Sequence, residues 1–184
     1  MVVAEELLGK VIVRSTGEGT VAVRIDEVEA YLGPEDRACH TWGGRTTPRV
    51  RSMWGEAGCA YVYLIYGLHH CLNVVTIGEG HGEAVLIRGG RIVEGGDLAS
   101  QRRGGPSDDL RLADGPGKLC QALAVTRDDD GADLCDPKSG LVILDDGAVS
   151  TRVERTPRIG IGSAGDAASW PLRFVLRETS SSSR

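Results

Sequence analysis

A run of alternating residues constrains the fold more than any other feature of this sequence. Between residues 21 and 25 apolar side chains occupy every odd position, which is the spacing of a half-buried β-strand. Glu27, Glu29 and Tyr31 continue the same odd-numbered face, so acidic groups occur where apolar ones had been. The sequence therefore predicts a strand on which the core-facing positions become polar.

Two interpretations of these carboxylates are open. Charged side chains that face a core are costly unless they are paired or functional. Either the strand leaves the core here and its carboxylates meet water, as most surface carboxylates do, or Glu29 and Tyr31 form the wall of a pocket.

The length of 184 residues suits one domain with a sizeable core. We expect a single domain over residues 1–178 and a loose polar tail over residues 179–184. The first residues lack a basic start and a long apolar run, so no signal peptide is expected. No apolar stretch approaches the roughly 18–20 residues of a membrane span. The cytoplasm is the expected location.

Charge and aromatic residues are unevenly distributed. The net charge of −5 argues mildly against a polyanionic partner. However, Arg37, Arg45, Arg49 and Arg51 occupy a stretch without acids, and a bipolar protein can bind nucleic acid through one basic face. All four tyrosines lie within residues 31–66, which favours a stacking surface over scattered core packing.

Cysteine and histidine give little support to a metal site. The five cysteines, 39, 59, 71, 120 and 135, include no Cys-x-x-Cys pair and are expected to be buried, reduced thiols. His69 and His70 are adjacent, so on a strand they point to opposite faces. No metal and no cofactor are expected, although a metal hydrolase that uses the histidines remains an alternative.

Strands outnumber helices and mostly follow tight turns, which indicates an α+β fold with a curved, mainly antiparallel sheet flanked by short helices. Besides the strand through Glu29, we expect strands over residues 11–13, 60–66, 68–77, 84–88, 141–144, 149–153, 158–161 and 172–176. We expect helices over residues 5–8, 48–54, 91–100 and 118–123, a surface loop at 104–109 and an acidic loop at 127–140.

Several stretches in register resemble the alkyladenine (3-methyladenine) DNA glycosylase family of the bacterial type. They are Glu29-Ala30-Tyr31-Leu32-Gly33-Pro34-Glu35-Asp36 with His40, Gly43-Gly44-Arg45-Thr46-Thr47-Pro48-Arg49, Tyr61-Val62-Tyr63-Leu64-Ile65-Tyr66-Gly67 with Asn73, Ala84-Val85-Leu86-Ile87-Arg88, Gly115-Pro116-Gly117-Lys118-Leu119-Cys120-Gln121-Ala122-Leu123, Arg158-Ile159-Gly160-Ile161 and Pro171-Leu172-Arg173-Phe174. The resemblance implies a single domain with a curved antiparallel sheet and a protruding β-hairpin that enters the minor groove of DNA.

The resemblance also assigns the reaction. Such an enzyme flips a damaged purine out of the duplex and hydrolyses its bond to the sugar. Glu29 matches the carboxylate that activates water, with Glu27 as its competitor, and Arg88 matches the residue that helps to hold the water, together with the carbonyl of Ile159. Gly89 and Gly90 follow Arg88 where the family usually carries side chains, which leaves backbone freedom at this point.

Four side chains match the family's base pocket. Tyr31 and His40 are expected to stack on the two faces of the flipped base, and Tyr63 is expected to close the pocket. Asn73 matches the residue that disfavours guanine by crowding its exocyclic amine. The alternative for Asn73 is a strand amide that bonds to the backbone.

Two further positions match contacts to the DNA. Tyr66, beside Gly67 at a strand tip, is expected to fill the gap that the flipped base leaves; the alternative is a turn tyrosine that packs on its own hairpin. Tyr63 and Tyr66 have opposite strand parity and should not share a wall. The amide of Gly160 resembles a phosphate contact.

The expected activity is therefore that of a monomeric, monofunctional DNA glycosylase that acts on double-stranded DNA at the nucleoid. The lysines Lys10, Lys118 and Lys138 lie outside the pocket motifs, so no Schiff base is expected. A catalytically silent damage-binding protein with the same pocket is the main alternative.

Overall fold

The computed structural model describes residues 1–106, 111–147 and 152–177. Within these ranges the strands form one eight-stranded, mainly antiparallel sheet in the order β3-β4-β5-β2-β1-β6, with β8 and then β7 added to the other half of β2. The strands are β1 (Val11–Thr16), β2 (Gly19–Tyr31), β3 (Ala60–Ile65), β4 (His69–Val75), β5 (Ala84–Glu94), β6 (Leu141–Leu144), β7 (Val153–Thr156) and β8 (Arg173–Leu176).

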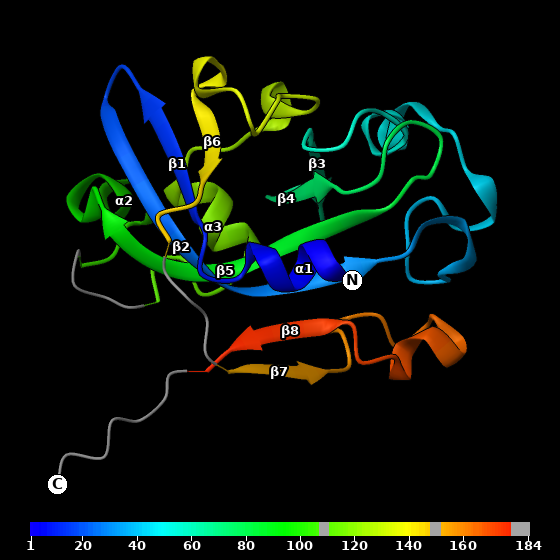
Figure 1. Cartoon of the computed structure of the whole chain (residues 1–184). Coiled ribbons are helices and arrows are strands. Elements are labelled where there is room, and N and C mark those ends of the chain that lie inside the picture. Colours follow the sequence, from blue (N-terminus) through cyan, green and yellow to red (C-terminus); the bar gives the residue numbers. More distant parts are fainter. Residues whose placement is uncertain (107–110, 148–151, 178–184) are drawn as a thin grey trace, which may run out of the picture.

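Short helices flank this curved sheet (Figure 1). The α-helices are α1 (Val2–Leu7), α2 (Gly96–Arg103) and α3 (Pro116–Ala122). Short 3-10 helices occupy the connections: η1 (Gly33–Glu35), η2 (Trp42–Gly44), η3 (Pro48–Trp54), η4 (Arg127–Asp129), η5 (Pro137–Ser139) and η6 (Gly165–Ser169). The expected α+β class with a curved antiparallel sheet is confirmed.

The long strand β2 changes the face that it presents to the core. Ile25 pairs with Gly90 of β5 and Glu27 pairs with Gly89, so Asp26 has no direct partner. Such a β-bulge bends a strand and re-aims its side chains. Ile25 packs in the main core together with Val28 and Ala30. Glu27 and Glu29 therefore face the opposite side, and the expectation that they continue the odd-numbered apolar face is wrong.

A second bulge lies in β5, directly across from the first. Val28 pairs with Ile87 and Glu27 pairs with Gly89, which leaves Arg88 as the extra residue. The register thus places Arg88 on the same face as the carboxylates of β2.

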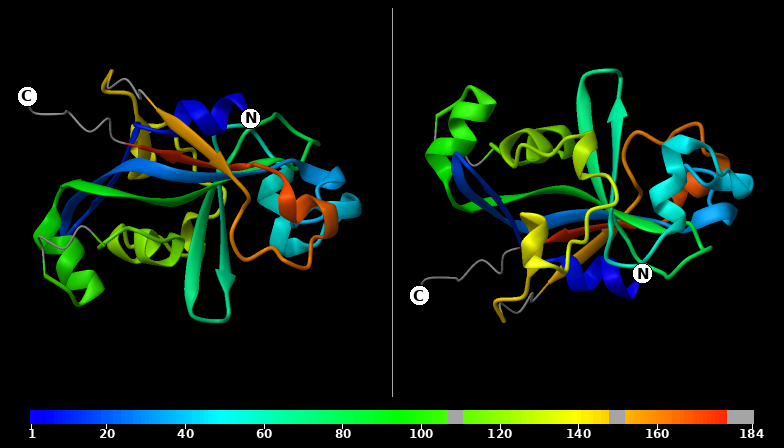
Figure 2. Two further views of the ribbon diagram at one scale, coloured as in Figure 1. Left: turned by 90° about the horizontal axis from the view of Figure 1, so that it is seen from below. Right: turned by 90° about the horizontal axis from the view of Figure 1, so that it is seen from above.

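The hairpin of β3 and β4 projects from the body of the molecule, as the teal segment of Figure 2 shows. Tyrosines alternate with aliphatic residues along β3, and β4 ends in the apolar residues Val74 and Val75. Tyr66 (φ 53°) and Gly67 (φ 68°) both adopt left-handed backbone conformations at the tip, and Leu68 N–H closes the turn by donating to Ile65 O at 3.1 Å. The expected protruding hairpin is present.

Two apolar clusters stabilise the fold. The main core joins α1 and α3 to the sheet. A smaller cluster, which includes Met53, Tyr61, Tyr63 and Leu86, lies between the sheet and η3. All five cysteines are free thiols, as expected, but the expectation that they are buried is wrong for Cys59, which is partly buried, and for Cys135, which is exposed. Within the described ranges, no helix is long and apolar enough to cross a membrane.

Some of the expected elements are wrong. Residues 91–94 continue β5 and the helix begins only at Gly96, so the helix over 91–100 is wrong in its first half. Residues 158–161 form an irregular segment instead of a strand. Most of the strand expected over 149–153, half of the loop at 104–109 and the tail at 179–184 lie outside the described residues.

Candidate active site

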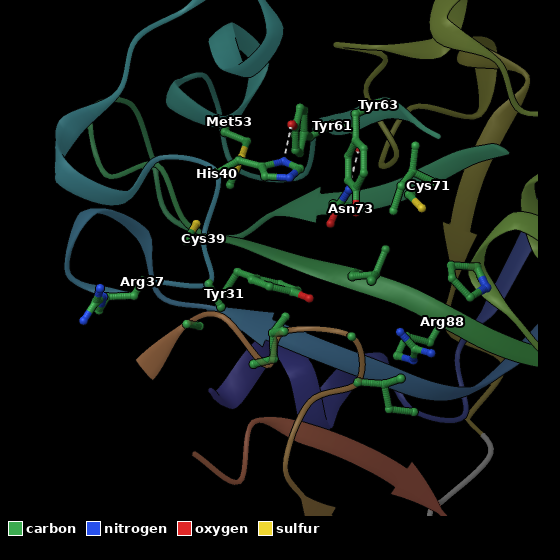
Figure 3. Close-up of a pocket in the computed structure, with 18 of the residues that line it drawn as sticks. Tyr31, Arg37, Cys39, His40, Met53, Tyr61, Tyr63, Cys71, Asn73 and Arg88 are labelled. Carbon is green, nitrogen blue, oxygen red and sulfur yellow. Dashed lines mark hydrogen bonds between the residues drawn. The ribbon is translucent and has the colours of Figure 1, made fainter. Parts of the chain in front are cut away.

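A cavity of about 480 Å³ opens on the face of the sheet that carries Glu29. It is bounded by the sheet, the loop after β2, the N-terminus of α3 and the segment 159–164. Figure 3 shows Tyr31 on one side of this cavity and His40, Tyr61 and Tyr63 on the other. The volume lies within the usual range of small-molecule sites.

The sheet register sets one row of this site. Tyr61, Asn73, Leu86 and Glu29 lie directly opposite one another on β3, β4, β5 and β2. Directly paired residues of neighbouring strands share a face of the sheet. Four segments of the sequence are therefore aligned across one wall by backbone pairing alone.

Three rings form one aromatic wall. The His40 ring meets Tyr63 edge-on with 4.6 Å between ring centroids, and the centroids of Tyr61 and Tyr63 are 5.4 Å apart. His40 Nδ1 and the Tyr61 hydroxyl share a hydrogen bond of 2.7 Å. The guanidinium of Arg49 lies over the Tyr63 ring at 5.4 Å. Such contacts hold the rings before any ligand arrives.

The surroundings of His40 keep its imidazole neutral. Burial lowers the pKa of His40 to about 4, and the positive charges of Arg49 and Arg45 act in the same direction. Near pH 7 one ring nitrogen therefore donates and the other accepts.

The Glu29 carboxylate lies directly behind the cavity wall and is fully buried. Tyr31 Oη donates to Glu29 Oε2 at 2.9 Å, and Ile159 N–H donates to Oε1 at 2.7 Å. Arg88 Nη1 is 3.4 Å from Oε2. All three partners line the cavity, whereas Glu29 exposes no surface of its own. The interpretation that this carboxylate meets water is wrong.

Glu29 also affects the ionisation of its neighbours. Burial raises the pKa of the Tyr31 phenol and the negative charge of Glu29 raises it further, so the phenol stays protonated and donates. Burial opposes the charged form of Arg88, but Glu29 and Glu27 outweigh it and raise the pKa of the guanidinium.

A buried ion pair supports the second wall of the cavity. The side chains of Arg158 and Asp36 expose no surface, and Arg158 Nη2 donates to Asp36 Oδ1 at 2.8 Å. Arg158 Nη1 also donates to Ala30 O at 2.8 Å, and its guanidinium lies 4.7 Å from the Tyr31 ring centroid. The pair thereby ties β2 to the residue that precedes Ile159.

Asn73 lies at the back of the cavity and is almost fully buried. Its Nδ2 donates to Tyr61 O at 2.9 Å, so the bond to the backbone expected as the alternative exists alongside a place in the cavity wall. This bond directs Nδ2 of the amide toward the backbone of β3, so Oδ1 is the end that points away from it.

The hairpin tip exposes two large apolar side chains. Tyr66 is 85% exposed and Leu68 is 76% exposed, so the alternative in which Tyr66 packs on its own hairpin is wrong. Tyr66 also borders the cavity, as does Tyr63. The expectation of separate walls rested on strand parity, which does not extend to Tyr66, because this residue follows the end of β3 and has a left-handed backbone.

The structure brings together Glu29, Arg88, Tyr31 and Ile159 by direct contact, and places His40, Tyr63, Asn73, Tyr66 and Gly160 on the cavity wall. The sequence analysis missed Tyr61, Arg158 and Arg173. Tyr61 stands two residues from Tyr63 on one strand, and this spacing could have identified it. Arg158 carries no comparable signal, because its partner Asp36 is 122 residues away.

The histidines and acids do not gather around a common point. Among the described residues, no three His, Cys, Asp or Glu side chains lie close enough together to hold a metal ion. His40 bonds to Tyr61, and His81 Nδ1 is 3.0 Å from Gly78 O.

Fold and site together define a protein with a curved sheet, a projecting hairpin, and an aromatic cavity backed by a buried carboxylate. The sequence model of the family described as "Methylpurine-DNA glycosylase (MPG)" matches residues 1–180. The chain belongs to this family of DNA glycosylases, which are hydrolases of DNA repair.

Similar proteins come from distant organisms. One from Methanocella arvoryzae is 47% identical over 172 residues, which cover 94% of this chain and 84% of the relative. One from Desulfitobacterium hafniense is 42% identical over 186 residues, with 97% and 91% covered. One from Bdellovibrio bacteriovorus is 47% identical over 182 residues, with 96% and 89% covered. Each bears the name "Putative 3-methyladenine DNA glycosylase". These findings confirm the resemblance that the sequence motifs indicated.

Proposed function

We propose that this glycosylase removes alkylated or deaminated purines from double-stranded DNA by hydrolysis with a water molecule that Glu29 activates. The observation that carries the proposal is the Glu29 carboxylate, which is buried behind an aromatic cavity and bonded to Tyr31 and Ile159 of its wall. The base-to-sugar bond is inaccessible inside a duplex, so the nucleotide must be flipped into this cavity.

The aromatic walls suit a flat purine. Tyr31 faces the group of His40 and Tyr63 across the cavity (Figure 3), so a base between them would stack on both faces. Stacking contributes roughly 1–3 kcal/mol per base, and a cationic alkylated purine adds cation–π attraction. We assign Asn73 the role of crowding the exocyclic amine of guanine.

The hairpin supplies the contact with the duplex. Tyr66 is exposed at its tip and would enter the minor groove to fill the gap left by the flipped base. Ile159 N–H is committed to Glu29, which leaves its carbonyl to hold water. The amide of the neighbouring, exposed Gly160 would bind a phosphate.

Hydrolysis proceeds through a sugar that resembles an oxocarbenium ion. Glu29 takes a proton from the attacking water and offsets the positive charge on the sugar, while Arg88 helps to hold that water. A cationic purine leaves without much help from an acid. The product is an abasic site.

The enzyme would be monofunctional. An amine that formed a Schiff base would have to reach the sugar, and no lysine is among the described residues that line the cavity. Lys10 pairs with Asp145, and Lys118 pairs with Asp114. One chain supplies all of the groups invoked, so we infer that the enzyme acts as a monomer. Because its proposed substrate is double-stranded DNA, we also infer that it acts in the cytoplasm at the nucleoid.

The test uses duplexes that each carry one defined lesion: 3-methyladenine, 7-methylguanine, hypoxanthine or ethenoadenine. The wild type should release free base from at least one duplex and leave the abasic strand uncut. Glu29→Gln should fold and bind lesion DNA, yet its single-turnover rate should fall about 10²–10⁴-fold, as expected for loss of a general base. Glu79→Gln, which changes an exposed carboxylate, is the matched control.

Three outcomes would contradict the proposal. Base release by Glu29→Gln at the wild-type rate would remove the carboxylate from the mechanism, and an adduct trapped by borohydride would show an amine nucleophile. A wild type that binds lesions but never releases base would be a damage-binding protein.

A further inference from the structure

Arg88 lies between two carboxylates and is bound unequally by them. Its Nε donates to Glu27 Oε1 at 2.8 Å, a short charge-assisted hydrogen bond. Its Nη1 is 3.4 Å from Glu29 Oε2. The guanidinium is therefore held mainly by Glu27, the carboxylate to which the proposed reaction gives no task.

Glu27 holds a second arginine with the same oxygen. Arg173 Nε donates to Glu27 Oε1 at 2.6 Å, and Arg173 Nη1 donates to Thr156 Oγ1 at 3.0 Å. Two carboxylates and two guanidinium groups thus form a largely buried cluster whose formal charges cancel. Within it, the close contacts of both arginines are to Glu27, and Glu29 is the less closely paired acid.

The backbone explains why this arrangement is reproducible. The bulges at Asp26 and Arg88 flank the pair formed by Glu27 and Gly89. Ile25 pairs with Gly90 on one side of the bulges and Glu29 pairs with Leu86 on the other, so the two bulges offset each other and keep Arg88 beside Glu27 and Glu29.

We propose that Glu27 is a positioning residue that holds Arg88 away from full pairing with Glu29, so that the Glu29 carboxylate remains free to accept a proton. The inference rests on the proposed function, because it assigns Glu29 as the base. A carboxylate locked in a two-point pair with a guanidinium is a weak base, since the paired cation stabilises its charged form.

Neutralising Glu27 should redistribute these interactions. Without the negative charge on Glu27, Glu29 becomes the only anion within reach of Arg88 in the cluster. The guanidinium should then close the 3.4 Å separation and form the tight pair. The base becomes weaker and the position for water is lost, although neither Glu29 nor the aromatic wall has changed.

The experiment is a pair of double-mutant cycles on single-turnover base release, with lesion-duplex affinity and urea unfolding measured for each variant. Glu27→Gln should slow base release on the order of 10²-fold, as a misplaced catalytic group does, with little change in affinity. Arg88→Gln should also slow it. The double variant should be no slower than Arg88→Gln, because Glu27 acts through Arg88.

Arg173 supplies the comparison for a merely structural role. If Glu27 matters only as an anchor for β8, the non-additive effect on base release should appear between Glu27→Gln and Arg173→Gln. The rate of base release should then fall in step with the free energy of unfolding. We expect instead that Arg173→Gln slows base release less than Glu27→Gln does. Glu27→Asp keeps the charge and should retain more base release than Glu27→Gln. If Glu27→Gln does not fold, base release by Glu27→Asp can still be measured and compared with the wild type.

Each contrary outcome has a distinct meaning. Additive effects of Glu27→Gln and Arg88→Gln would overturn the positioning role and leave the proposed function intact. If Glu27→Gln abolishes base release while Glu29→Gln does not, Glu27 is itself the base. A wild type that releases no base would overturn the proposed function and this inference together.

Discussion

The imidazole of His40 illustrates what single residues contribute to this molecule. It shares a hydrogen bond with Tyr61, and its protonation is disfavoured by burial first and then by the positive charges of nearby arginines. A neutral ring can stack on a cationic base without charge repulsion, which an imidazolium could not do. The cost is that the folded state binds a proton on this residue less readily than the unfolded chain does.

This difference predicts a pH dependence of stability. The ordinary pKa of histidine is 6.5, and that of His40 in the folded chain is lowered to about 4. The contribution of His40 to the free energy of unfolding is therefore complete above pH 6.5. It is lost as the pH falls from there to about 4, where the folded and the unfolded chain both become protonated at this residue. The free energy of unfolding in urea, measured at pH 7 and near pH 4, should fall less for His40→Gln than for the wild type. His81→Gln, at an exposed position, should behave as the wild type, and identical pH dependence in His40→Gln would contradict the assignment.

The sequence indicated the residues of the site better than it indicated their contacts. The motif around Glu29 and Tyr31 identified a carboxylate beside an aromatic ring, and these side chains bond to each other. The face that they occupy was mispredicted, because a bulge at Asp26 leaves no mark in the hydrophobic pattern. The bond from Ile159 to Glu29 joins residues 130 positions apart, and no local pattern contains such information.

At the scale of elements, close packing of the backbone explains why glycines follow Arg88. A Cβ atom added at Gly90 would lie 2.2 Å from Arg24 O, and one at Gly89 would lie 3.2 Å from Ala113 O. Both residues pair with β2. The sequence suggested backbone freedom beside Arg88, but close backbone approach explains these glycines, and the sheet holds them in place.

Gly90→Ala should therefore destabilise the chain. A backbone atom cannot move aside as a flexible side chain can, so overpacking should cost about 2–3 kcal/mol of unfolding free energy. Gly78→Ala is the matched control, since a Cβ there would meet nothing within 4 Å and the backbone is not in the left-handed region. Chemical denaturation measures both, and equal stabilities would contradict the close approach.

The tip of the hairpin makes a second prediction at this scale. Because Tyr66 is 85% exposed, Tyr66→Ala should change the free energy of unfolding by less than about 0.5 kcal/mol. Base release from duplex DNA should nevertheless slow about tenfold or more, since the flipped state loses its wedge, which must offset a few kcal/mol of unstacking. Leu144→Ala, which truncates an exposed side chain on β6, should leave base release unchanged. Equal rates for Tyr66→Ala and the wild type would exclude the wedge.

The elements themselves were largely predictable. Most expected strands appear where alternating or apolar runs predicted them. The helix expected over 91–100 was wrong because two glycines concealed the continuation of β5. The strand expected over 158–161 was wrong because its apolar residues border a cavity, and the buried pair of Arg158 with Asp36 fixes the segment in place of sheet pairing.

At the scale of the whole molecule, the net charge of −5 hides a basic region. Four exposed arginines follow β2 in the chain: Arg37 and Arg45 on the connecting loop, and Arg49 and Arg51 on η3. If they bind phosphates, affinity for lesion duplexes should fall as salt rises, with a slope of log K against log salt of about −0.9 for each phosphate that the protein neutralises.

Replacing Arg45 and Arg49 together by glutamine should reduce the magnitude of this slope by roughly 1 for each phosphate that the variant no longer binds. Arg177→Gln is the control, since this exposed arginine pairs with Glu154 at the far end of β8. Fluorescence anisotropy over a series of salt concentrations measures the slopes. If the double variant keeps the wild-type slope, these arginines do not touch the DNA backbone.

The C-terminal half of β2 has neighbours from two distant parts of the chain, β5 from the middle on one edge and β8 from near the C-terminus on the other. Glu27 precedes its partner Arg173 by 146 positions, and Glu29 precedes Ile159 by 130. During translation the acids therefore leave the ribosome long before the residues that orient them. Under the proposed mechanism, a nascent chain that stalls after β6 would carry every tyrosine together with Glu27 and Glu29 but would lack Ile159 and Arg173, so it should release no base until the last strand docks.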